Sequence, residues 1–224
     1  MSHSVEEQQQ ATAGVPAPRP PAETPAEAAA SEPAAGGDPG LIGLPVFIAG
    51  SVALGLVLVG FVPTASGGAA IPVIMTATAV GLLVAAVWAA RLAQSAVAGV
   101  FAVFAGFWIS YAALVLGLGH GWFGIATADV TRSVESFLVA WLVVIGLLTL
   151  GSLRLPAAFT LLFALVEVAL LLDLLGTSSA STGLVKTAGW FVFAFAAVGA
   201  YLYLSGLSAA TGGRAYPAGR PLVH

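Results

Sequence analysis

The sequence lacks cysteine and has few charged side chains. None of its 224 residues is a cysteine, and only 8% are charged, whereas an ordinary soluble domain carries roughly a quarter. The absence of cysteine excludes disulfides, thiolate nucleophiles and Cys–metal sites. Histidine occurs only three times, twice near the chain ends, so we expect no metal centre. No basic cluster suits a phosphate backbone, so we expect no nucleic-acid partner.

The few ionisable groups are also poorly placed for catalysis. Acid–base or nucleophilic catalysis needs paired acids, or a nucleophile beside its base. Glu167 and Asp173 are six residues apart, which puts them about 240° apart around a helix, on different faces. We therefore expect no enzymatic activity, and the sequence implies no cofactor.

Apolar residues, by contrast, are abundant. Hydrophobic residues make up 59% of the chain, and the mean hydropathy is +1.00. A spanning helix needs about 20 apolar residues, and the alternating pattern of a β-barrel is absent. The sequence therefore predicts an all-α integral membrane protein in a lipid bilayer, a six-transmembrane-helix bundle within residues 41–210, followed by a short tail, 211–224. The predicted spans are 44–62, 69–90, 95–118, 134–152, 155–175 and 186–208.

Residues 1–40 have a different composition. They hold seven of the thirteen prolines and six of the ten acids, with almost no large apolar side chains. Such a segment cannot bury enough surface to offset the entropy of ordering, so we predict a disordered N-terminal tail. It is either inert or a binding site for a partner.

The bases predict the orientation. Cytoplasmic loops of membrane proteins are enriched in Lys and Arg. If the N-terminus is cytoplasmic, six spans return the C-terminus to the same side. The outer segments then hold two bases, and the inner segments hold five, which predicts that both termini are cytoplasmic. The outer bases are Arg132 and Lys186, and the inner ones are Arg19, Arg91, Arg154, Arg214 and Arg220.

Aromatic residues share one face of the third span. Phe101, Phe104, Trp108 and Tyr111 follow each other at spacings of three, four and three, which places them on one helix face. Two interpretations are open. The stripe is either a packing seam between helices or a hydrophobic gate along a path, since such constrictions close by excluding water.

Glu167 lies near the middle of the fifth span. A carboxyl at this depth is costly to ionise, so it faces a cavity or a partner, or stays protonated. Glu167 is therefore the candidate for proton coupling in a transporter. The alternative is a neutral carboxyl that is hydrogen-bonded to a neighbouring helix.

An ordered series of motifs carries a family resemblance. They are DPGLIGL at 38–44, GFWIS at 106–110, Trp141 in the fourth span, AGW at 188–190, GAYL at 199–202 and GRAYPAG at 213–219. The series resembles the acetate uptake transporter family, the YaaH-type succinate–acetate permeases, over about residues 38–220.

The resemblance implies a function and a site. Members of that family have six helices per protomer with a pore in each, assemble as hexamers, and move acetate and sometimes succinate, often with a proton. The chain is thus expected to be a transporter or channel for small monocarboxylates in the plasma membrane. The family's constriction corresponds to Phe47, Phe104 and Val166. The candidates for lining the path or binding the solute are Ser51, Thr78, Trp108, Ser110 and Tyr111.

The chain departs from the family pattern. Asp38 and Leu41 replace an Asn and a Pro of the first motif, the Gln of the second span is missing from residues 78–82, and Val144-Ile145 replaces a Phe-Thr pair. Amides and hydroxyls replace the water around a bound carboxylate, and this chain has fewer of them than the family pattern. We therefore interpret the chain as a divergent member. The alternative function is a non-transporting scaffold or sensor that binds a partner through residues 1–40.

Overall fold

The computed structural model describes residues 37–223. Residues 1–36, which are nearly all of the predicted tail, lie outside the described part. The partner-binding role predicted for the tail therefore concerns residues outside it as well. Within the described part, every regular element is a helix. Six of the helices are long and apolar enough to cross a membrane. The prediction of an all-α six-helix membrane protein is therefore confirmed.

The first, third, fifth and sixth spans are single α-helices, and the second and fourth are composite. The second span joins a 3-10 helix, a π-helix and α4, and the fourth joins two short 3-10 helices to α6. The bounds are α3 Gly40–Leu58, η1 Thr64–Ala70, η2 Val73–Ala79, α4 Val80–Arg91, α5 Ser95–His120, η3 Thr127–Asp129, α6 Val130–Gly151, η4 Ser152–Arg154, α7 Ala157–Ser178 and α8 Thr182–Ala210.

Three α-helices begin four residues earlier than the apolar runs predict, and one of them is α8, which begins at Thr182 rather than 186. The helix α3 begins at Gly40 rather than 44, because the Asp38 carboxylate accepts a hydrogen bond from the Gly40 amide at 2.8 Å and so satisfies an unpaired donor of the first turn. The helix α6 begins at Val130 rather than 134. It therefore includes Arg132, which the apolar pattern left outside.

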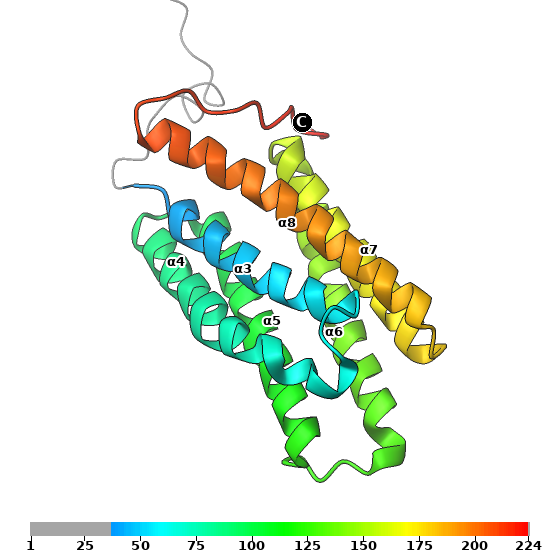
Figure 1. Ribbon diagram of the computed structural model, residues 1–224. Helices are drawn as coiled ribbons and strands as arrows, with labels where there is room; N and C mark the ends of the chain where they lie inside the picture. The colour runs from blue at the N-terminus through cyan, green and yellow to red at the C-terminus, as the bar shows by residue number, and fades with distance from the viewer. Residues whose placement is uncertain (1–36, 224) are drawn as a thin grey trace, which may run out of the picture. The chain divides into compact units, whose positions relative to one another are not determined.

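The helices are arranged around a common centre (Figure 1). Buried apolar side chains pack in that centre. Neighbouring helices pack against each other in this order: α5 against α4, α4 against α3, α3 against α8, α8 against α7, and α7 against α6. The backbones of α5 and α6 approach each other only over a short stretch. Aromatic rings fill the space between these two helices, as Phe107 packs against Phe137 and Trp141 at centroid distances of 5.8 and 5.3 Å.

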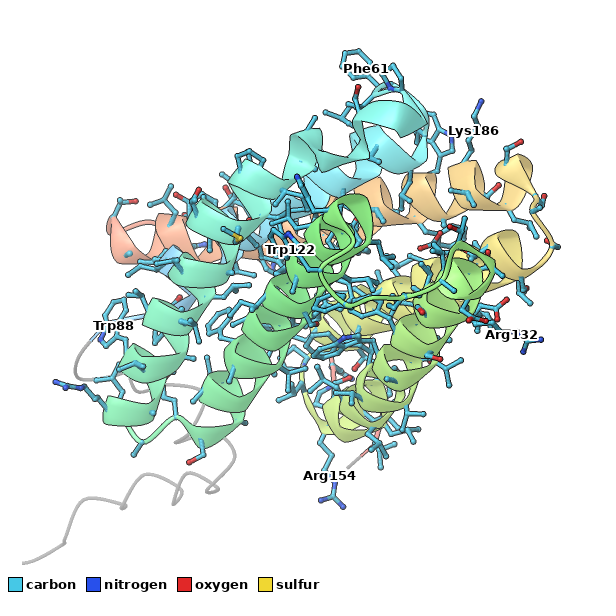
Figure 2. All side chains as sticks on the ribbon, turned by 90° about the horizontal axis from the view of Figure 1, so that it is seen from below. Phe61, Trp88, Trp122, Arg132, Arg154 and Lys186 are labelled. Carbon is cyan, nitrogen blue, oxygen red and sulfur yellow. The ribbon has the colours of Figure 1, made fainter. Side chains whose placement is uncertain are left out.

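Charged and aromatic residues mark both ends of the helices. Figure 2 shows Phe61, Arg132 and Lys186 at one end, and Trp88 and Arg154 at the other. Aromatic and basic side chains are typical of the two interfaces of a membrane with water. The residues at the two ends of the helices are therefore of the kinds expected where a spanning bundle meets the two membrane surfaces.

A polar contact ties the second span to α3. The Thr78 hydroxyl on η2 donates to the Val46 carbonyl at 2.9 Å. The two helices approach closely because Gly50 has no side chain, since a Cβ there would lie 2.5 Å from the Thr78 Oγ1. Small residues allow this approach in lipid, where packing and hydrogen bonds hold helices together.

We predict that Gly50→Ala destabilises the protein. The added methyl group has to displace Thr78 and break its bond to Val46, and overpacking of this kind costs about 1–3 kcal/mol. Gly99→Ala on α5 is the matched control, because a Cβ at Gly99 meets no atom within 4 Å. Thermal unfolding in detergent should show a lower Tm for Gly50→Ala only, and equal Tm values would contradict the close approach.

Candidate functional site

A cavity of about 40 Å³ lies among five of the six long helices. A buried water needs roughly 10–15 Å³ when volume is measured in this way, so the cavity has room for a few waters or a solute of a few heavy atoms. Its walls are made of aromatic and aliphatic side chains, and the only lining residues that carry polar side-chain groups are Trp108, Tyr111 and Asp173. The lining residues are Phe47, Leu54 and Leu58 of α3; Phe104, Phe107, Trp108 and Tyr111 of α5; Phe137 and Leu138 of α6; Val166, Ala169, Leu170 and Asp173 of α7; Val192 and Phe195 of α8.

The lining residues of α5 and α7 follow the same helical spacing. On α5 the cavity meets positions 104, 107, 108 and 111, and on α7 it meets 166, 169, 170 and 173. Both sets have the spacing i, i+3, i+4 and i+7, which is one face of an α-helix. About two turns of one face of each helix therefore line the cavity.

The cavity has two levels along its axis. Because α3, α5 and α7 run in the same direction (Figure 1), residues seven positions on lie about 10.5 Å further along each helix. The first level consists of Phe47, Phe104 and Val166, which we call the aromatic level. The second consists of Leu54, Tyr111 and Asp173, which we call the polar level.

At the aromatic level the structure brings together the three residues that the sequence predicts as a constriction. Phe47 meets Phe104 edge to face, with ring centroids 5.0 Å apart. Phe195 also packs on Phe47, and Phe163 stacks on Phe104, at 5.6 and 6.0 Å. Phe47, Phe104 and Val166 are each at least 94% buried. Rings packed in this way exclude water from the centre of the bundle.

The three hydroxyls predicted to line the path are bonded within the protein instead. Ser51 donates to the Phe47 carbonyl at 2.7 Å, and Thr78 donates across to α3. Ser110 donates to the Phe107 carbonyl at 2.9 Å and accepts from the Trp141 indole at 3.2 Å. In a helix, a Ser hydroxyl readily bonds a carbonyl of the preceding turn. None of the three hydroxyl residues lines the cavity.

The two other predicted residues, Trp108 and Tyr111, do line the cavity. Trp108 is 1% exposed, and no atom of the described residues accepts a hydrogen bond from its indole N–H. A buried donor without a partner is costly. The Trp108 N–H is therefore a buried donor without a partner on a residue that lines the cavity.

Glu167 lies outside the cavity lining, whereas Asp173, which the sequence does not predict as a site residue, belongs to it. Glu167 lies against α6, where a Cβ on Gly146 would be 3.5 Å from its Oε1. It does not line the cavity, although its Oε2 is buried without a hydrogen-bond partner. Asp173 does line the cavity. Its distance of seven residues from Val166 is the signal that could have identified it.

These features define a multi-pass helical membrane protein with a cavity on the axis of its bundle. The chain matches the model of the GPR1/FUN34/yaaH family over residues 22–216, and it therefore belongs to that family. This result confirms the family that the sequence motifs predict. No curated protein matches the chain in sequence.

A solved structure with a similar fold is described as "Structure of the bacterial acetate channel SatP". The two chains superpose with a TM-score of 0.70 and share 19% sequence identity. The match covers 80% of this chain and 96% of the other. At this identity the likeness establishes the fold.

We predict that Phe104→Ala destabilises the bundle, because the truncation leaves a void between Phe47 and Phe163. Lipid is as apolar as the core, so the lost contacts and the void make the main contribution, on the order of 1–3 kcal/mol. Phe61→Ala is the control, since Phe61 is 76% exposed. An unchanged Tm for Phe104→Ala in detergent would contradict the tight packing at the aromatic level.

Proposed function

We propose that the protein is a transporter or channel that moves acetate and similar small monocarboxylates across a cell membrane. The observation that carries this proposal is the cavity on the bundle axis, with its aromatic level beside its polar level. Membership of the family, and the similarity to a structure described as an acetate channel, support it.

The lining favours a solute with a small apolar group and one carboxyl group. The aromatic level presents only rings and aliphatic groups, which a methyl group can pass without losing hydrogen bonds. The carboxyl group needs donors to replace its water, and the two lining residues that carry donors are Trp108 and Tyr111. No covalent chemistry is required, because the rings of Phe47 and Phe104 have only to move apart for passage.

Several finer features of the proposal come from the sequence. We propose a plasma-membrane location with both termini in the cytoplasm, a homo-oligomer that is a hexamer by resemblance, and succinate as a second solute. The placement of Arg154 at the opposite end from Arg132 and Lys186 (Figure 2) supports the orientation. Glu167 as the proton-coupling residue also stays a prediction.

Uptake of labelled acetate into vesicles that contain the purified protein tests the function. Because acetic acid also crosses lipid unaided, uptake into protein-free vesicles is subtracted. The proposal expects a saturable, protein-dependent component that other short monocarboxylates inhibit. If no short monocarboxylate shows such a component, the proposal is wrong.

We predict that Val166→Phe reduces acetate uptake by about tenfold or more, because a third ring at the aromatic level leaves no path past Phe47 and Phe104. Val168→Phe is the matched control. It makes the same change two residues further along α7, at a position that is 37% exposed and outside the cavity lining. Equal uptake by the two variants in vesicles would show that the solute does not pass this level.

A further inference from the structure

The cavity contains a carboxyl group and no cationic side chain. Asp173 is one of its lining residues, whereas no lysine, arginine or histidine is. A carboxylate solute that enters the cavity as an anion therefore meets a like charge and no compensating one. Like charges in a site of low dielectric cannot both persist, so one of the two groups has to hold a proton.

The other groups around Asp173 do not change this charge balance. The lining residues from α3 are Phe47, Leu54 and Leu58, and those from α6 and α8 are also all apolar. The only other titratable group is the Tyr111 hydroxyl of α5, which is neutral in its protonated form. On α7 itself, Glu167 is outside the lining. The proton has to be shared between Asp173 and the solute.

We propose that Asp173 determines which form of the solute is transported: a monocarboxylate passes the polar level only together with one proton, which it shares with the Asp173 carboxyl. In that arrangement one carboxyl O–H donates to the other carboxylate. Solute and proton then move together without net charge. This inference rests on the proposed function, takes the proton that the family resemblance implies, and adds to it the residue that shares this proton.

Asp173 has a different role from the hydrophobic constriction. It lies on the α7 face of Val166, about two turns further along, so it selects by charge whereas the aromatic level selects by size. Removing the carboxyl should therefore change the dependence on pH and on membrane voltage. It should not close the path.

Acetate uptake into vesicles at about pH 6 and about pH 8 tests the proposal, with the membrane potential clamped by a potassium gradient and valinomycin. Free acetate is almost fully ionised at both values, since aliphatic carboxyls titrate near pH 4–5. For the wild-type chain we expect uptake to fall about tenfold or more from pH 6 to pH 8, because a bound proton is required. We also expect no response to the potential.

Asp173→Asn keeps the shape of the side chain and removes the charge. We expect its uptake to change less than about twofold between the two pH values and to increase when the vesicle interior is positive, because the anion then passes alone. Asp173→Glu should behave as wild type. Asp129→Asn makes the same change at an exposed residue outside the cavity lining, so it is the matched control and should keep the wild-type response to pH and potential.

The outcomes distinguish this inference from the function on which it rests. If wild type transports acetate but Asp173→Asn keeps both the steep pH dependence and the insensitivity to voltage, Asp173 is not the selecting group. The same holds if Glu167→Gln alone loses the pH dependence. If wild type transports no monocarboxylate, the proposed function fails instead. Asp173→Ser gives the same comparison if Asp173→Asn does not elute as a single species in detergent.

Discussion

The structure depends on one constraint, which is that lipid cannot hydrogen-bond to the chain. Each backbone group has to be satisfied within a helix, so that only side chains remain to join one helix to another. The same constraint acts on the hydroxyls. Ser51 and Ser110 bond carbonyls of their own helices, and Thr78 bonds the Val46 carbonyl of α3. Polar groups that would otherwise be available to a solute are thereby used to hold the bundle together, and few are left for the cavity.

The centre of the bundle follows from how the helices pair. The helices α5 and α6 follow each other in the chain but remain apart over most of their length, so rings from several helices fill the space between them. Five helices contribute to the cavity lining, and three of them supply matched residues at positions seven apart. In the proposed function, size and charge are therefore selected at separate levels, by the rings around Phe47 and by the carboxyl of Asp173.

Much of this could be predicted from the sequence, and the remainder depended on tertiary contacts. Length and hydropathy are sufficient for six spans, and the ordered motifs were sufficient for the family. The meeting of Phe47, Phe104 and Val166 came from the resemblance. The partner of Thr78 is 32 residues away, which no local pattern indicates. Glu167 lies against Gly146 of α6, and this packing determines which residues of α7 face the cavity instead. Comparing Asp173 with Val166, rather than with Glu167, would have placed it on the lining face.

The most direct test of the central claim, that the cavity is the path of the solute, uses the natural absence of cysteine. Ala169→Cys puts a single thiol on the cavity wall between the two levels, and Leu147→Cys puts one on the surface of α6, at a position that is 66% exposed. Only a thiol in contact with water forms the reactive thiolate. The account predicts that a small methanethiosulfonate labels Ala169→Cys, that acetate slows this labelling, and that Leu147→Cys stays unlabelled. Labelling of Ala169→Cys that is absent, or that acetate does not affect, would contradict it.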